Sequence, residues 1–228
     1  MADTESAARS VGRARVLVVD DHPVVRQGLK QLIDAQGDLA VHAEAGSVHE
    51  ALQILRSSKP DAVLVDLSLE DASGMELIRD VKQRHPGVPV LVVSMHDEAL
   101  YAERALKAGA SGYIMKDAPT GEVLSALRRV LAGGLYLSEA MSSRMLQQYV
   151  GGVSLATGCS VNHLTDRELE IFEMIARGRS TREIAESLHL SPKTVETHRT
   201  HVVDKLNLKN SAELLRYAIH WLARDARS

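Results

Sequence analysis

The sequence predicts an α/β domain with a doubly wound, five-stranded parallel sheet, followed by an all-α domain of four helices. Over residues 14–131, short apolar runs alternate with amphipathic stretches, as in a parallel sheet whose strands are buried on both faces. Over residues 161–228 the strand pattern is absent and helix-start signals repeat. Residues 132–160 form a linker between the two domains.

The apolar runs predict five strands. They are Val16–Asp20, Leu39–Ala45, Ala62–Asp66, Val88–Ser94 and Gly112–Met115. Leu39–Ala45 has the most mixed polarity, so we expect it at an edge of the sheet. The stretches between and after the runs predict the helices Val24–Ala35, Ser47–Ser58, Met75–Arg84, Glu98–Ala108 and Thr120–Leu131. Five successive βα units predict the doubly wound arrangement.

The linker begins near Gly133-Gly134 and includes a short predicted helix, Ser138–Tyr149. It ends in the small-residue stretch Gly151–Ser160, whose composition is typical of a flexible connection. Beyond it, each helix of the second domain has a start signal. Two are the capping boxes Thr165–Glu168 and Ser180–Glu183.

The other two helix starts are Ser191-Pro192, a cap before a proline, and Asn210 followed by Glu213. The second and third helices are joined by about four residues, which outlines a helix-turn-helix. Caps alone would also fit any small helical domain.

Composition excludes several classes of protein. The chain has 228 residues, 27 Lys and Arg, 30 Asp and Glu, and a net charge of −3. No apolar run approaches the ~18 residues of a membrane span, and Met1–Arg15 lacks the apolar segment of a signal peptide. The single cysteine, Cys159, excludes an internal disulfide and a zinc site built on several cysteines. We therefore expect a cytoplasmic protein without a membrane partner.

Charge does not point to nucleic acid. Residues 161–228 contain 11 Lys and Arg against 10 Asp and Glu, so the helical domain is barely basic. If this domain binds DNA, we expect modest affinity per monomer and reliance on dimerisation.

Polar side chains follow four of the predicted strands: Asp20-Asp21, Asp66, Ser94 and Lys116. Ligands bind beyond the carboxyl ends of parallel strands, so we expect these groups to converge. Oxygen ligands favour Mg²⁺, and a carboxylate can attack phosphorus while a cation balances the developing charge. Taken singly, each residue is as well explained as a turn former, a helix cap or a solvated charge. Their occurrence together at the ends of four strands favours a functional site.

These residues carry a resemblance. Val16–Asp21, Asp66 with Gly74 eight residues later, Ser94 and Gly112–Lys116 resemble the receiver domain of bacterial response regulators, a flavodoxin-like and CheY-like fold, over residues 14–131. The family commonly has Met-Pro where this chain has Leu69-Glu70, so the lifetime of a phosphoryl group is open.

The resemblance implies the roles of the site residues. Asp66 would accept a phosphoryl group from a sensor histidine kinase, and Lys116 would contact the phosphate. Mg²⁺ would be held by Asp21, Asp66 and the Ser68 carbonyl, with Asp20 acting through water. Ser94 and Tyr113 would be the paired switch residues, although a tyrosine in an apolar strand is also a usual core residue.

The third helix of the second domain, Ser191–Leu206, places Val195 and Val202 on one side and polar residues on the other. A DNA-recognition helix needs such a polar face, as does any solvated helix. The motif decides between them. Leu164–Glu168, Gly178, Glu183–Ala185, Leu190-Ser191, Thr194-Val195, His198 and Lys205-Leu206 resemble the LuxR-type helix-turn-helix over residues 161–225. The whole chain is similar to NarL/FixJ-type response regulators.

This second resemblance implies base contacts from Glu196, Thr197 and Thr200. It implies phosphate contacts from Thr181, Arg182, Lys193, Arg199, Lys209 and Asn210. Arg199 and His198 also have a structural interpretation, beside the core. The fourth helix, Ser211–Ala223, has a broad apolar surface that the sequence cannot divide between core and dimer contact.

Together the motifs predict a phosphorylation-dependent transcriptional regulator and not an enzyme. Its expected partners are promoter DNA, a sensor histidine kinase, RNA polymerase and, on DNA, a second copy of the chain. One alternative is a phosphorylation-independent DNA-binding regulator whose receiver is a dimerisation module. Another is an aspartyl-phosphate phosphohydrolase, but such enzymes have an Asp where Ser68 stands.

Overall fold

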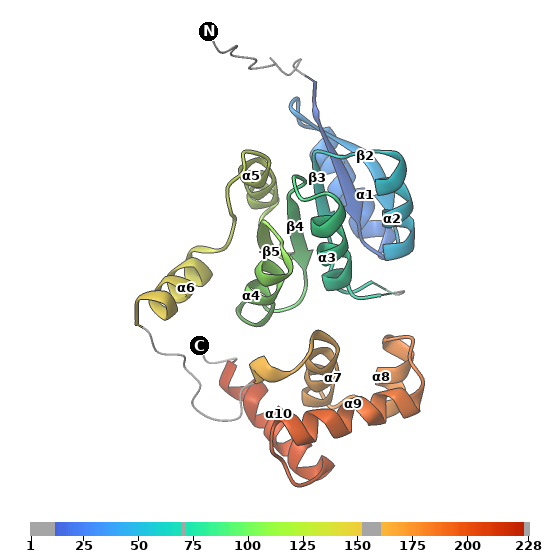
Figure 1. Ribbon diagram of the computed structural model, residues 1–228, viewed down its shortest axis with the longest axis vertical. Helices are drawn as coiled ribbons and strands as arrows, with labels where there is room; N and C mark the ends of the chain where they lie inside the picture. Colours follow the sequence, from blue (N-terminus) through green and yellow to red (C-terminus); the bar gives the residue numbers. More distant parts are fainter. Residues whose placement is uncertain (1–11, 70–71, 152–160, 226–228) are drawn as a thin grey trace. The chain divides into compact units, whose positions relative to one another are not determined.

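A computed structural model describes residues 12–69, 72–151 and 161–225 (Figure 1). It divides into two compact units, Met1–Met141 and Ser142–Ser228, and each is treated by itself. Glu70, Cys159 and all but the first residue of the stretch Gly151–Ser160 lie outside the described residues.

The first unit contains one five-stranded sheet in which every pair of neighbouring strands is parallel. The strands are β1 (Ala14–Val19), β2 (Leu39–Ala45), β3 (Ala62–Val65), β4 (Val90–Ser94) and β5 (Gly112–Met115). Their order is β2-β1-β3-β4-β5, which confirms both the predicted fold class and the edge position of Leu39–Ala45. Strands β3 and β4 are buried along their whole length.

Five helices surround the sheet: α1 (Pro23–Asp34), α2 (Val48–Ser57), α3 (Gly74–Arg84), α4 (Glu98–Ala108) and α5 (Thr120–Leu131). Side chains of α1 and α5 share one hydrophobic core with β1, β3 and β4, so these two helices cover the same face. Side-chain caps begin three of the helices: Ser47 for α2, Ser73 for α3 and Asp97 for α4.

The strand order determines where a ligand can bind. β1 lies between β2 and β3, so the chain leaves β1 toward one side and returns on the other. A crevice forms at such a reversal beyond the carboxyl ends of the strands. Asp20 follows β1 and Asp66 follows β3, and both therefore lie at this crevice.

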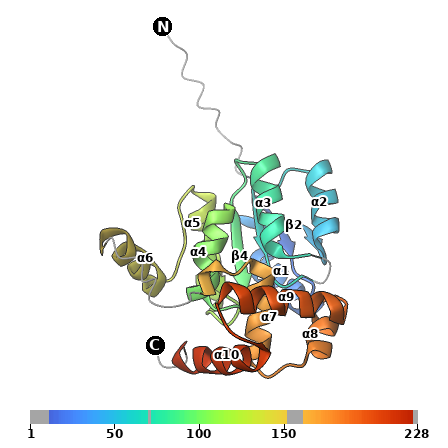
Figure 2. The ribbon, with the colours of Figure 1, turned by 60° about the horizontal axis from the view of Figure 1, so that its bottom comes forward.

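The second unit is helical within the described residues. After α6 (Glu139–Gly151), which begins within the first unit, come a short 3₁₀ helix (Val161–His163), α7 (Asp166–Ala176), α8 (Thr181–Ser187), α9 (Pro192–Lys205) and α10 (Ser211–Asp225). Figure 2 shows α7, α8, α9 and α10 grouped together. None of the helices described is both long and apolar enough to cross a bilayer.

The predicted caps form as expected. Both capping boxes have their two reciprocal hydrogen bonds, and Ser191 caps α9 ahead of Pro192. The core between the helices includes Phe172 of α7, whose ring meets Trp221 of α10 edge-on at 5.2 Å between centroids. This contact ties the last helix to the first of the group.

Candidate functional site

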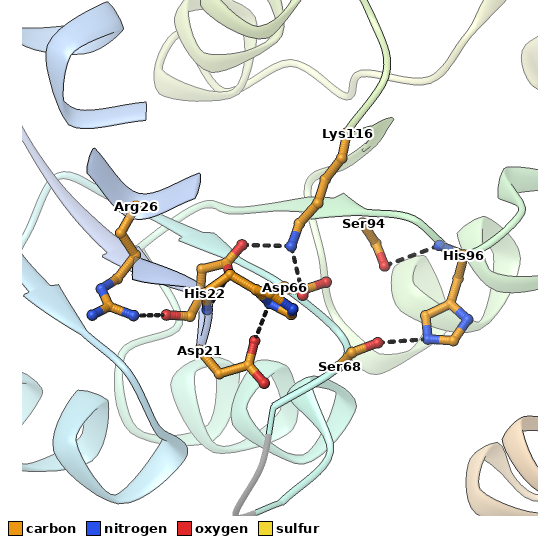
Figure 3. Close-up of polar contacts among 9 residues, drawn as sticks. Asp21, His22, Arg26, Asp66, Ser68, Ser94, His96 and Lys116 are labelled. Carbon is orange, nitrogen blue, oxygen red and sulfur yellow. Dashed lines mark hydrogen bonds and ion pairs between the residues drawn. The ribbon is translucent and has the colours of Figure 1, made fainter. Parts of the chain in front are cut away.

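Lys116 joins the two buried carboxylates at the crevice (Figure 3). Its ammonium nitrogen lies 2.6 Å from Asp20 Oδ2 and 2.7 Å from Asp66 Oδ2. The side chains of Asp20 and Asp66 are 2% and 3% exposed, and that of Lys116 is 9% exposed. The structure thus brings together the three groups that the sequence placed at the ends of three different strands.

The charges in this cluster support one another. Burial acts to lower the pKa of the Lys116 ammonium, but the charges and hydrogen bonds of Asp66 and Asp20 outweigh it, so this pKa is raised. Lys116 is therefore a permanent positive charge at neutral pH. Such a charge stabilises the anionic oxygens of a transferring phosphoryl group.

Asp21 and His22 complete the cluster. His22 Nδ1 lies 2.6 Å from Asp21 Oδ1 and 3.4 Å from Asp20 Oδ1. Burial raises the pKa of the Asp21 carboxyl, and nearby Asp66 and Asp20 raise it further, against the opposing effect of His22. When acidic neighbours raise the pKa of a carboxyl group, a bound cation stabilises its ionised form.

The cluster has the donors that a divalent ion needs. Asp20, Asp21, His22 and Asp66 each offer one ligand atom, and these atoms lie within 4.8 Å of one another. Asp66 Oδ1 is buried and has no hydrogen-bond partner within the described part of the chain. Buried oxygens are rarely left without a partner, so this atom fits a site that holds an ion or a phosphoryl group.

Gly74 shapes the loop that follows Asp66. It is the first residue of α3, and its amide donates to the Leu67 carbonyl at 3.0 Å. A Cβ at this position would lie 2.1 Å from the Asp66 carbonyl oxygen and 2.7 Å from Leu67 Cα. Only glycine permits this close approach, which explains the glycine at the eighth position after Asp66.

Ser94 and Tyr113 meet the same segment, around His96. Ser94 is fully buried, and its hydroxyl accepts from the His96 amide at 3.3 Å. The Tyr113 ring is also fully buried, and its hydroxyl donates to the His96 carbonyl at 2.7 Å. The ring is therefore already inside the domain, and its movement with phosphorylation stays a prediction.

Ser68 is linked to this segment through its side chain. Its hydroxyl lies 2.9 Å from His96 Nε2 (Figure 3), and the His96 ring lies against the Tyr101 ring, tilted by 32°, with 4.4 Å between the centroids. His96 thus connects the loop after Asp66 to both switch candidates. The role of the Ser68 carbonyl stays a prediction.

In the helical unit, three of the predicted DNA-contact residues bind one another. Thr181 Oγ1 donates to Glu196 Oε1 at 2.6 Å, and Arg199 Nη1 donates to Thr181 Oγ1 at 3.3 Å. The Arg199 side chain is 16% exposed, which agrees with its alternative, structural interpretation. These bonds fix α8 against α9 and orient Glu196.

The other predicted contacts lie on exposed positions. Lys193, Thr197 and Thr200 are exposed along α9, while Arg182 pairs with Glu186 at 2.9 Å on the surface of α8. Lys209 is exposed too, but the Asn210 side chain accepts from the Glu213 amide at 3.0 Å. Asn210 therefore serves as the cap of α10, whatever it contacts on DNA.

Sequence reasoning missed two histidines in the first unit. His22 directly follows Asp20-Asp21, and His96 comes two residues after Ser94. Their adjacency to predicted site residues was the available signal. What each ring contacts depends on packing between distant segments, which the sequence pattern does not give.

Comparison with known proteins gives matches over both units. The response regulator receiver domain matches residues 16–128, and the bacterial regulatory proteins of the luxR family match residues 162–218. The oxygen regulatory protein NreC of Staphylococcus carnosus (strain TM300) is 36% identical over 209 residues, covering 90% of this chain and 96% of that protein.

Solved structures give a consistent result. A LuxR-family two-component response regulator from Aurantimonas sp. SI85-9A1 is 35% identical with a TM-score of 0.57, and the match covers 61% of this chain and 99% of that one. RcsB from Salmonella enterica serovar Typhimurium, bound to promoter rprA with the phosphomimetic BeF₃⁻, has a TM-score of 0.60 at 23% identity. That match covers 91% of this chain and 98% of RcsB, and it shows likeness of fold.

Proposed function

The chain belongs to the NarL/FixJ-type response regulators, DNA-binding transcriptional regulators of two-component systems and not enzymes, and we propose that a phosphoryl group on Asp66 controls its binding to DNA. The observation that carries the proposal is the buried cluster in which Lys116 bridges Asp20 and Asp66. Because the chain belongs to this family, the alternative of an aspartyl-phosphate phosphohydrolase is excluded.

The reaction follows from the charges of this cluster. A carboxylate oxygen of Asp66 attacks the phosphorus of a phosphohistidine, the P–N bond breaks, and the imidazole of the donor keeps the electron pair and takes up a proton. Lys116 stays within reach of the Asp66 carboxylate and balances the charge on the phosphoryl oxygens. We expect Ser94 to donate its hydroxyl proton to one of these oxygens once the phosphoryl group is present.

We infer that Asp21 and Asp66, with Asp20 through water and the Ser68 carbonyl, hold Mg²⁺. When bound, the ion supplies positive charge that offsets the repulsion between the carboxylates and the incoming phosphoryl group. His22 contacts Asp21 Oδ1 in the structure, so we expect its ring to give up this contact when a cation occupies the site.

A groove beside the cluster suits the domain of the sensor kinase that carries the phosphohistidine. It is a pocket of about 450 Å³ lined by residues of α1, the ends of β4 and β5 and the start of α5, among them Lys116. Val24, nearby on α1, is 85% exposed. We expect Val24→Glu to slow transfer from the kinase and to leave labelling by acetyl phosphate unchanged.

In the helical unit, α9 is the proposed recognition helix, with Glu196, Thr197 and Thr200 toward bases. The apolar residues Leu215 and Ile219 of α10 are 40% and 50% exposed. Because the unit carries little net positive charge, we propose that two copies pair through α10 on the promoter and that each adds its own contacts.

The first test is the labelling of Asp66 by a small-molecule phosphodonor. The full-length protein is incubated with Mg²⁺ and acetyl [³²P]phosphate. We expect labelling of the wild type and of Asp117→Asn, a matched control at an exposed carboxylate beside Lys116. Asp66→Asn should not be labelled. Labelling of Asp66→Asn at the wild-type level would contradict the proposal.

A further inference from the structure

A second group of metal-ligating side chains lies where α7 meets α9, apart from the phosphoacceptor cluster. Glu168 of α7 and His198 and His201 of α9 each offer one ligand atom, and these atoms lie within 4.8 Å of one another. His201 Nδ1 is 3.7 Å from Glu168 Oε1, which is too long for a hydrogen bond. The DNA-binding function uses none of these contacts.

The spacing suits a transition-metal ion. Zinc bonds to nitrogen and oxygen are about 2.1 Å long, so two ligand atoms in a tetrahedral site lie about 3.4 Å apart. The observed 3.7 Å between His201 and Glu168 needs only a small contraction. His198 and His201 are three residues apart on one helix, so both rings can reach the same ion.

The protonation states also suit a metal. Burial lowers the pKa of the His198 imidazole, which favours its neutral form. Burial acts to raise the pKa of the Glu168 carboxyl, but hydrogen bonds from Lys205 and Thr165 outweigh it, so this pKa is lowered. Neutral imidazole and ionised carboxylate are the forms that bind metal ions.

His198 supplies an independent observation. Its Nδ1 atom is buried and has no hydrogen-bond partner among the residues that the structure describes. A metal bond to this nitrogen would satisfy it. His201, by contrast, is 53% exposed, which gives an ion a route from solvent and a position for a water ligand.

We propose that Glu168, His198 and His201 bind one Zn²⁺ ion, which ties the start of α7 to the recognition helix α9. The Glu168 oxygen that faces His201 is Oε1, whereas Oε2 accepts from Lys205 Nζ at 2.6 Å and from the Thr165 amide at 2.8 Å. The helix cap can therefore persist when the ion binds. The Lys205 ammonium opposes a nearby cation, and its side chain, 37% exposed, can turn to solvent.

The test is a titration of the full-length protein with Zn²⁺ against a chromophoric chelator, with saturating Mg²⁺ at the carboxylate cluster. We expect His201→Gln and His198→Gln to weaken one Zn²⁺ site by at least about ten-fold, since losing even an outer-shell partner costs that much. His220→Gln, at an exposed histidine of α10, is the matched control and should bind as the wild type does. Cys159→Ser and Asp66→Asn should also leave this site unchanged.

Lys205→Met gives the sharpest discrimination. Removing the ammonium next to Glu168 should tighten Zn²⁺ binding several-fold, because a like charge no longer opposes the ion. Zn²⁺ should also raise the melting temperature reported by Trp221, the single tryptophan of the chain, in the wild type and not in His201→Gln. Wild-type Zn²⁺ affinity in both histidine variants, or weaker binding by Lys205→Met, would overturn the proposal.

Discussion

Replacing Gly74 with alanine should destabilise the receiver unit and slow phosphoryl transfer to Asp66. The new Cβ would lie 2.1 Å from the Asp66 carbonyl oxygen and 2.7 Å from Leu67 Cα, far inside the 3.5–4.0 Å of a normal contact. Both atoms belong to the backbone at the phosphoacceptor, so relief of the clash must move the acceptor itself. Overpacking of this kind costs about 1–3 kcal/mol in the free energy of unfolding.

Urea unfolding can assign the loss to the correct unit. Far-UV circular dichroism follows the whole chain, whereas fluorescence follows Trp221 in the helical unit. Gly121→Ala is the matched control, because a Cβ there meets nothing within 4 Å. Alanine in place of this helical glycine of α5 should raise the free energy of unfolding by up to about 0.5–1 kcal/mol. The reasoning is refuted if Gly74→Ala unfolds at the wild-type urea concentration or if Gly121→Ala is destabilised equally.

Three further predictions follow from single contacts. Lys116→Met leaves the buried carboxylate of Asp66 without its ammonium partner, so the free energy of unfolding without Mg²⁺ should fall by about 3–5 kcal/mol. Mg²⁺ should then stabilise this variant more than it stabilises the wild type. Equal stabilisation of both proteins by Mg²⁺ in urea titrations would contradict this prediction. Burial lowers the pKa of His198, so the contribution of neutral His198 to the free energy of unfolding should be complete above pH about 6.5 and lost as the pH falls. In His198→Gln, the free energy of unfolding measured by fluorescence should therefore change less between pH 5 and 8. The same pH dependence in the variant and the wild type would refute this prediction. Ile219→Glu should weaken dimerisation by at least about ten-fold in sedimentation experiments, because burial of one such side chain is worth about 1.5–3 kcal/mol; unaltered dimerisation would exclude α10 as the interface.

Most of the sheet could be predicted because its central strands β3 and β4 are buried on both faces and therefore form continuous apolar runs. The bounds of β2 and β5 were predicted to the residue. The predicted strand Val88–Ser94 was too long at its start, since β4 begins at Val90. Pro89 precedes it and has no amide hydrogen to donate to a neighbouring strand. Helix α1 begins at Pro23, one residue before the predicted start, because the fixed φ of proline suits the first helical position.

The part of the candidate site that could be predicted is the set of residues that directly follow strands. Asp20, Asp66 and Lys116 converge because the carboxyl ends of β1, β3 and β5 lie at one edge of a parallel sheet. The contacts of His96 were not predictable, since they depend on how three loops pack.

The hydrogen bonds among Thr181, Glu196 and Arg199 could not be predicted from the sequence for a related reason. A helical wheel places residues around one helix, but the partner of each side chain comes from another helix. The same holds for Glu168, which meets two histidines of α9 across about thirty residues of sequence.

The most direct test of phosphorylation control is a DNA footprint of the full-length protein with and without acetyl phosphate and Mg²⁺. The probes are genomic fragments selected by their binding to the wild-type protein, and Asp66→Asn is compared on the same fragments. We predict that the phosphodonor raises the affinity of the wild type by about 5–150-fold, the usual range of coupling between two sites, and leaves Asp66→Asn unchanged. Equal footprints for the wild type with and without the donor would contradict control by Asp66 and would favour a regulator that binds DNA independently of phosphorylation.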